Sequence, residues 1–138
     1  MNETTGQIDI TEFNAVTACE KGHELELKGV DGITGTGIKL TIIGKHADPV
    51  NKWINKVVNQ AMRDQQMASR KGKSPDPKSL DEIRDQNIEG ACVRVTGWFG
   101  VKQSFAPDLL KAALKRNPHW IEQIVEESDD LGNFSSKQ

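Results

Sequence analysis

The chain has 138 residues, 36% hydrophobic and 28% charged, a balance typical of one globular domain rather than a disordered chain. Eighteen Lys and Arg residues against twenty Asp and Glu residues give a net charge of −2, which does not favour nucleic acid, because its binders usually carry a basic excess. No apolar run approaches the roughly 20 residues that span a bilayer, so we expect no membrane contact. The opening MNETTGQIDI lacks the basic start and apolar stretch of a signal peptide. We therefore expect the protein to stay in the compartment where it is synthesised.

The N-terminal stretch is polar, and we predict a flexible segment at 1–10 ahead of a single α+β domain at 11–128. Thr11 is predicted to cap a short helix that runs to about Glu20 and contacts the core through Phe13 and Val16. The stop signal of this helix is Lys21-Gly22.

Two strands forming a hairpin are predicted between Glu24 and Lys45. ELELKGV and GIKLTII alternate apolar and polar residues, which is the signature of a half-buried strand. The apolar positions are Leu25 and Leu27 in the first strand and Ile38, Leu40 and Ile42 in the second. The intervening DGITGTG has three glycines, which suit the positive φ angles of a turn. An isolated hairpin is marginal in water, so it must pack on the helices that follow.

A long helix is predicted from about Pro49 to Arg70. Asp48 is expected to accept free amide hydrogen bonds at its start, and proline fits the first turn. Apolar residues recur at spacings of three and four, and they form a stripe made of Val50, Trp53, Ile54, Val57, Val58, Ala61 and Met62. We interpret this stripe as facing the core; the alternative is an exposed surface for a partner.

A second helix is predicted after the polar break KGKSPDPKS. Ser79 and Glu82 in SLDE form a capping box, and the helix is expected to end near Trp98. Gly90 and Gly97 are poor helix residues that allow close helix crossing or end the helix. Its broad apolar face consists of Leu80, Ile83, Ile88, Ala91, Cys92, Val95 and Phe99.

Two short helices are predicted to complete the domain. Pro107-Asp108 begins the first, and Asn117-Pro118 ends it and opens the second within HWIEQIVEE. Residues 129–138 are predicted to be a flexible tail with Leu131 and Phe134 as its anchors. The predicted fold is α+β and mainly α, an N-terminal β-hairpin packed on a small bundle of about four helices. Trp53, Trp98 and Trp120 are predicted to be structural, buried at helix contacts.

No motif for catalysis or metal binding is visible. His23, His46 and His119 are widely spaced, and there is no HExxH, GxSxG, Walker loop or GxGxxG. Cys19 and Cys92 form no CxxC pair, and we interpret both as small apolar core residues. We therefore expect a protein that is not an enzyme, with no catalytic residues, no metal and no cofactor.

Charge is distributed unevenly along the chain. Between Arg63 and Lys78 five basic residues meet two acidic ones, whereas after Ile121 five acidic residues meet only Lys137. The simpler interpretation is two solvated segments. The alternative is head-to-tail self-association, with the basic segment of one subunit on the acidic segment of another. Its candidate residues are Arg70, Lys73, Glu126 and Asp130. The basic segment has no aromatic residue to stack on a base, which weakens a nucleic-acid interpretation.

The last third of the chain has a recognisable order of features. A predicted helix ends in Thr-Gly-Trp, a linker leads to a short Leu-rich helix, Asn-Pro opens a Trp-Ile helix, and Asn-Phe follows near the end. The positions are Thr96, Gly97, Trp98, Leu109, Leu110, Asn117, Pro118, Trp120, Ile121, Gln123, Asn133 and Phe134. This order resembles the C-terminal signature of tail assembly chaperones of long-tailed bacteriophages. The upstream part resembles them in layout only, and the linker VKQSFAPD is shorter than is usual in that family.

The resemblance implies a chaperone in the host cytoplasm, made in a short form and a frameshifted long form. Such proteins coat the tape measure protein, help the tail tube protein polymerise around it, and leave before the virion is complete. The alternatives are a structural virion subunit, such as a minor tail or connector protein, and a nucleic-acid-binding regulator that uses residues 63–78.

An amphipathic helix laid in a groove is a common mode of recognition, and the predicted C-terminal helix pair is our candidate surface for it. The residues expected to form or flank the groove are Leu110, Leu114, Ile121 and Val125. If these residues belong to the core instead, the partner is expected to contact their polar rim.

Overall fold

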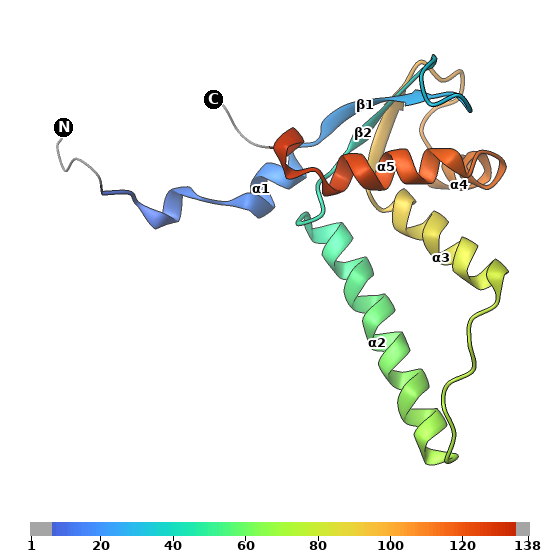
Figure 1. Cartoon of the computed structure of the whole chain (residues 1–138). Coiled ribbons are helices and arrows are strands. Elements are labelled where there is room, and N and C mark those ends of the chain that lie inside the picture. Colours follow the sequence, from blue (N-terminus) through green and yellow to red (C-terminus); the bar gives the residue numbers. More distant parts are fainter. Residues whose placement is uncertain (1–6, 135–138) are drawn as a thin grey trace.

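The computed structural model describes residues 7–134, and its fold is α+β with more helix than strand (Figure 1). Helices account for 55% of the chain and strands for 15%, which confirms the predicted fold class. In chain order the elements are the 3-10 helix η1 (Ile10–Glu12), α1 (Ala15–Glu20), β1 (His23–Lys28), β2 (Gly35–Ile42), α2 (Asp48–Arg70), α3 (Leu80–Cys92), β3 (Val95–Phe99), α4 (Pro107–Arg116), α5 (His119–Asp129) and the 3-10 helix η2 (Leu131–Phe134).

The sheet has three antiparallel strands in the order β1-β2-β3. The predicted hairpin is confirmed, with Leu25 opposite Leu40 in the β1–β2 register. The third strand corrects the sequence prediction, which continued the helix to Trp98. α3 ends at Cys92, and Trp98 lies on β3 opposite Leu40 of β2. The run VTGWF has β-branched and aromatic residues around a glycine. These residues have a weak helix propensity and favour a strand, so the segment pairs with β2.

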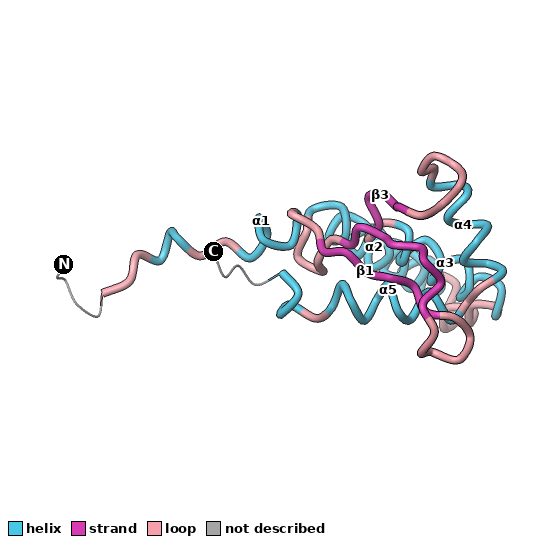
Figure 2. Tube along the Cα trace, turned by 90° about the horizontal axis from the view of Figure 1, so that it is seen from above, coloured by secondary structure: helices cyan, strands magenta, loops and turns pink. Residues whose placement is uncertain are grey.

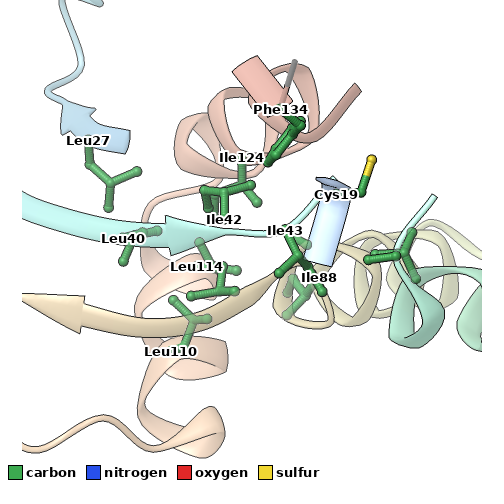
Figure 3. Close-up of a cluster of buried hydrophobic side chains, with 14 residues drawn as sticks. Cys19, Leu27, Leu40, Ile42, Ile43, Ile88, Leu110, Leu114, Ile124 and Phe134 are labelled. Atoms are coloured by element: carbon green, nitrogen blue, oxygen red, sulfur yellow. The ribbon is translucent and has the colours of Figure 1, made fainter. Parts of the chain in front are cut away.

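The hydrophobic core lies between this sheet and the helices α3, α4 and α5 (Figure 3). Leu27 and Leu40 from the strands and Leu114 and Ile124 from the helices are fully buried. Ser128 is a buried polar residue of α5, and its hydroxyl donates a hydrogen bond of 2.8 Å to the carbonyl oxygen of Ile43. This bond satisfies both groups inside the core and ties the end of α5 to the chain that leaves β2.

The N-terminal helix predicted at 11–20 is interrupted in the structure. Asp9 accepts the hydrogen bond from the Thr11 amide at the start of η1, and Asn14 caps α1, so Thr11 is not the cap. Phe13 and Val16 are 71% and 45% exposed, and neither contacts the core as predicted. The helix is too short to bury a whole apolar face, and only Cys19 of α1 is buried. Figure 2 shows this segment leading away from the body.

The predicted flexible termini lie partly outside the described residues, which exclude 1–6 and 135–138. At the C-terminal side, folded structure continues past residue 129 as far as Phe134, which is 7% exposed and meets His23 edge-on with the ring centres 6.0 Å apart. A side chain at Gly44 would collide with Cys19 and crowd Phe134, so a glycine is needed where these three segments meet.

α2 begins within one residue of the predicted position, but its start is built differently. Ala47 is the N-cap residue and provides no side-chain hydrogen bond, and Asp48 is already helical. A carboxylate from another element, Glu20 Oε2, accepts a hydrogen bond of 3.4 Å from the Asp48 amide. This pairing puts negative charge at the positive end of the helix dipole and attaches α1 to the first turn of α2.

The apolar stripe of α2 corrects a second prediction, because most of it does not face the core. Of the predicted stripe, only Val50 is buried, whereas Ile54, Val58 and Met62 are 37%, 48% and 55% exposed. α2 leaves the body at its first turns and projects away from it (Figure 1). Within the described residues, no other helix or strand packs extensively along it. We call residues 54–83, the projecting part of α2 with the linker and the first turn of α3, the arm.

The first turns of α2 are held against α3 by Trp53. Its ring lies where a side chain at residue 90 would stand, so Gly90 permits the close approach. Its Nε1 donates a hydrogen bond of 2.8 Å to Glu89, and the guanidinium of Arg94 stands 5.7 Å from the ring centre. The predicted capping box of α3 is confirmed, with Ser79 and Glu82 satisfying each other's amides.

Candidate partner-binding surfaces

The four residues predicted to form a partner groove are not on one open surface. Leu110 and Leu114 are 2% and 0% exposed and belong to the hydrophobic core, while Ile121 and Val125 are half-buried. For Leu110 and Leu114 this is the alternative stated from the sequence, in which the residues belong to the core and a partner contacts their polar rim; binding of a partner here stays a prediction. α4 and α5 pack against α3, and α5 packs against β1 and β2, so their apolar faces are already occupied.

An apolar pocket of about 270 Å³ lies beside Leu110, between α4 and the face of the sheet formed by β2 and β3. Its walls are mainly aliphatic and aromatic, and they include Ile38, Trp98, Leu109, Leu110 and Trp120. Leu109 stands at the rim with 43% of its surface exposed. Arg116 and Asn117 also line the pocket and supply polar groups. A mainly apolar recess with a few polar groups is the usual form of a small binding site.

Trp98 forms one wall of this pocket and is fixed by two contacts. Its Nε1 donates a hydrogen bond of 2.9 Å to the carbonyl oxygen of Gln103. Its ring meets the Phe105 ring edge-on, with the ring centres 5.0 Å apart. Both partners belong to the linker between β3 and α4, so Trp98 holds that linker over the end of the sheet. The residue is half-buried and lies on a strand, not at the helix contact that was predicted.

Trp120 also lines the pocket, and it joins α5 to the end of β1. Its Nε1 donates a hydrogen bond of 2.9 Å to the carbonyl oxygen of Lys28. Gln123, one turn further along, accepts a bond of 2.8 Å from the Lys28 amide and donates one of 3.3 Å to its carbonyl oxygen. These contacts leave both backbone groups of Lys28 satisfied where β1 becomes irregular.

The two Asn residues of the C-terminal signature end the helices that precede them. Asn117 Nδ2 donates a hydrogen bond of 2.9 Å to the Ala113 carbonyl oxygen in the last turn of α4. Asn133 Nδ2 donates one of 3.1 Å to the Glu127 carbonyl oxygen in the last turn of α5. The Ala113 carbonyl oxygen also accepts the Asn117 backbone amide, so Asn117 binds it twice; the bond from Asn133 adds a partner for a carbonyl in the last turn of α5. Both residues therefore have a structural role at a helix end.

The basic and acidic segments lie at different ends of the molecule. Arg70 and Lys73 are exposed at the far end of the arm, whereas Glu126 and Asp130 are exposed on α5 and directly after it (Figure 1). The structure does not bring these four predicted residues together within one chain. Self-association through them stays a prediction, and their separation means that any contact between them joins two copies.

Arg94 and Cys92, next to the contact between α2 and α3, are ionisable residues whose pKa values are changed by burial. Burial lowers the pKa of Arg94, whose Nη1 donates a short hydrogen bond of 2.6 Å to the Gly90 carbonyl oxygen. Burial also raises the pKa of the Cys92 thiol to about 11, so the nucleophilic thiolate is scarce at neutral pH.

Among the residues that the structure describes, no group of three or more His, Cys, Asp and Glu side chains is placed to hold a metal ion. Between residues 7 and 134, no helix has the length and apolar character needed to cross a membrane.

Comparison with known protein families, curated proteins and solved structures finds no match for this chain. The family resemblance therefore rests on the C-terminal residues described above.

Proposed function

We propose that this protein is a tail assembly chaperone of a long-tailed bacteriophage, acting in the host cytoplasm. In this role it binds the elongated helical tape measure protein and promotes assembly of the tail tube protein around it. The sequence order of the C-terminal third supports the proposal through its family resemblance. The structural observation that carries it is the apolar pocket beside α4, because it is an open and mainly apolar recess next to the covered side chains Leu110 and Leu114.

The pocket suits one large apolar side chain of an amphipathic helix. Leu109 at the rim would contact the apolar stripe of that helix, and Arg116 and Asn117 would contact its polar flank. One such contact is weak. A long partner with repeated apolar positions allows many copies of the protein to bind side by side, so the effective affinity rises without any new contact.

Co-expression with the longest soluble fragment of the tape measure protein from the same genome tests the proposal. We expect the two proteins to copurify. Leu109→Gln removes the apolar rim and should reduce the recovered complex by about tenfold, since a lost apolar contact at an interface is worth on the order of 1–2 kcal/mol. Lys115→Gln is the matched control on the exposed side of α4, outside the pocket, and should not change recovery.

The alternative function is a structural virion subunit. If wild-type protein never copurifies with a folded fragment and purified particles contain it in stoichiometric amounts, the chaperone proposal is wrong and the structural subunit replaces it. Binding to nucleic acid that weakens steeply with salt would instead indicate a regulator that uses the basic end of the arm.

A further inference from the structure

The exposed apolar stripe of α2 is a second unoccupied surface, independent of the pocket. Ile54, Val58 and Met62 follow one another at intervals of four residues, so they lie along one side of the helix. α2 has 23 residues and is therefore about 34 Å long at 1.5 Å per residue. A long helix that exposes such a stripe to water along its projecting part is typical of an interaction surface.

The polar residues around this stripe are mostly uncharged. Asn51, Asn55 and Gln65 flank it, whereas the basic residues Lys56 and Arg63 lie on the opposite side of the helix at about 3.6 residues per turn. Two copies of the stripe can therefore face each other without bringing like charges together, although α2 as a whole is basic. A strongly charged partner would gain nothing from this uncharged rim.

The molecule is also electrically polarised, from the far end of the arm to the part of the body where α2 begins. The far end, which we call the tip, carries five exposed basic residues against Asp64 and Asp76, and they are Arg63, Arg70, Lys71, Lys73 and Lys78. The opposite end, which we call the base, has four exposed acidic residues against Lys21 and Lys45, and they are Glu20, Glu126, Asp129 and Asp130. The segments that carry these residues are adjacent in space. The Lys45 amide donates to the Ser128 carbonyl oxygen at 3.1 Å, next to Asp129, and Glu20 binds the Asp48 amide.

The stripe supplies only the apolar centre of a dimer contact. Ile54, Val58 and Met62 expose together the equivalent of about 1.4 whole residues, whereas a typical stable interface buries about 800 Å² per partner. The periphery of the contact must therefore come from the polar residues around the stripe and from the oppositely charged ends of the molecule.

From these observations we propose that two copies of this protein pair through α2 in an antiparallel, two-fold arrangement centred near Val58. In this arrangement Ile54 of one copy packs near Met62 of the other. The basic tip of each arm then approaches the acidic base of the other copy, so the charge attraction occurs twice. The dipoles of the two α2 helices run antiparallel, which is the favourable arrangement. The contact is isologous and closes as a dimer, unlike the open head-to-tail association considered from the sequence. It does not depend on the proposed function.

Sedimentation of the full chain over a range of protein concentrations tests the dimer. We expect a wild-type dimer that weakens at high salt but persists, because apolar contact supplies its centre. Val58→Glu with Met62→Glu places unpaired charges in that centre and should raise the dissociation constant by about a hundredfold or more. Gln60→Glu with Met67→Glu adds the same charge to the side of α2 opposite the stripe, where both residues are exposed, and should leave a dimer. Circular dichroism checks that both variants remain folded.

Cysteine cross-linking tests the register separately. Val58→Cys should form a disulfide-linked dimer under mild oxidation, because the two-fold arrangement brings residue 58 of both copies together. Gln60→Cys, which lies on the opposite side of α2, should remain a monomer on a non-reducing gel. A wild-type monomer at high concentration, or a stripe variant that dimerises as well as wild type, would overturn the proposal. A dimer that disappears at high salt and ignores the stripe variant would overturn it in favour of charge-driven association.

Discussion

Leu114→Ala and Leu109→Ala form a matched pair of substitutions on α4 that separates core packing from partner binding. Leu114 is fully buried, whereas Leu109 is 43% exposed at the rim of the pocket. Replacing a fully buried Leu with Ala costs about 2–5 kcal/mol through lost burial and the cavity left behind. The same change at Leu109 loses only part of that burial and leaves no closed cavity, so we expect about 1 kcal/mol or less.

For a chain of this size, 1 kcal/mol corresponds to roughly 3–4 °C in Tm. We therefore expect Leu114→Ala to lower the Tm by about 10 °C and Leu109→Ala by less than about 4 °C. Thermal unfolding followed by circular dichroism measures both changes, and urea unfolding checks that the transition stays cooperative. Equal shifts in the two variants, or an unchanged Tm for Leu114→Ala, would refute the assignment of Leu114 to the core.

Three further predictions concern other parts of the fold. Trp98→Ala should cost about 2–4 kcal/mol in unfolding free energy, because the half-buried indole loses its hydrogen bond and its aromatic contact; an unchanged Tm would show that it holds nothing in place. Gly100→Ala should destabilise the protein more than Gly72→Ala, since both residues have positive φ but only a side chain at Gly100 collides with backbone, and similar urea midpoints would contradict this. The pKa of Asp31 is lowered to about 2, chiefly by the hydroxyl of Thr34, so its favourable interactions are complete above the ordinary value of 3.8 and are lost as pH falls through about 2. An NMR titration should show this midpoint, and Thr34→Ala should move it upward.

Local chemistry was sufficient to predict several boundaries. The capping box at Ser79 and Glu82 and the break at Asn117-Pro118 depend on residues within one turn of each other. The β1–β2 hairpin was predictable for the same reason, because its strands are joined by a short glycine-rich loop and each alternates on its own. These elements need little information from elsewhere in the chain. Pro49 placed the start of α2 to within one residue, but the carboxylate that binds its first amide comes from Glu20 of α1.

The pocket was only partly predictable. The sequence placed the candidate surface near α4 and α5, but it did not distinguish Leu110 and Leu114, which are covered, from Leu109 at the open rim. All three belong to the same apolar pattern, and helical periodicity does not say how far a neighbouring element extends. The presence of Trp98 in the same pocket as Leu109 depends on β3, which the sequence pattern assigned to a helix.

The sequence alone determined where most helices begin and end, that the first two strands form a hairpin, and which side of each helix is apolar, because these properties arise from neighbouring residues. The tertiary structure decided that Val95–Phe99 is a strand, since its hydrogen-bond partners in β2 lie more than 50 positions away. It also decided that the stripe of α2 is exposed while those of α4 and α5 are covered. An apolar face records only that burial is favourable, and whether the same chain or another molecule provides the cover depends on how all the elements share the available core.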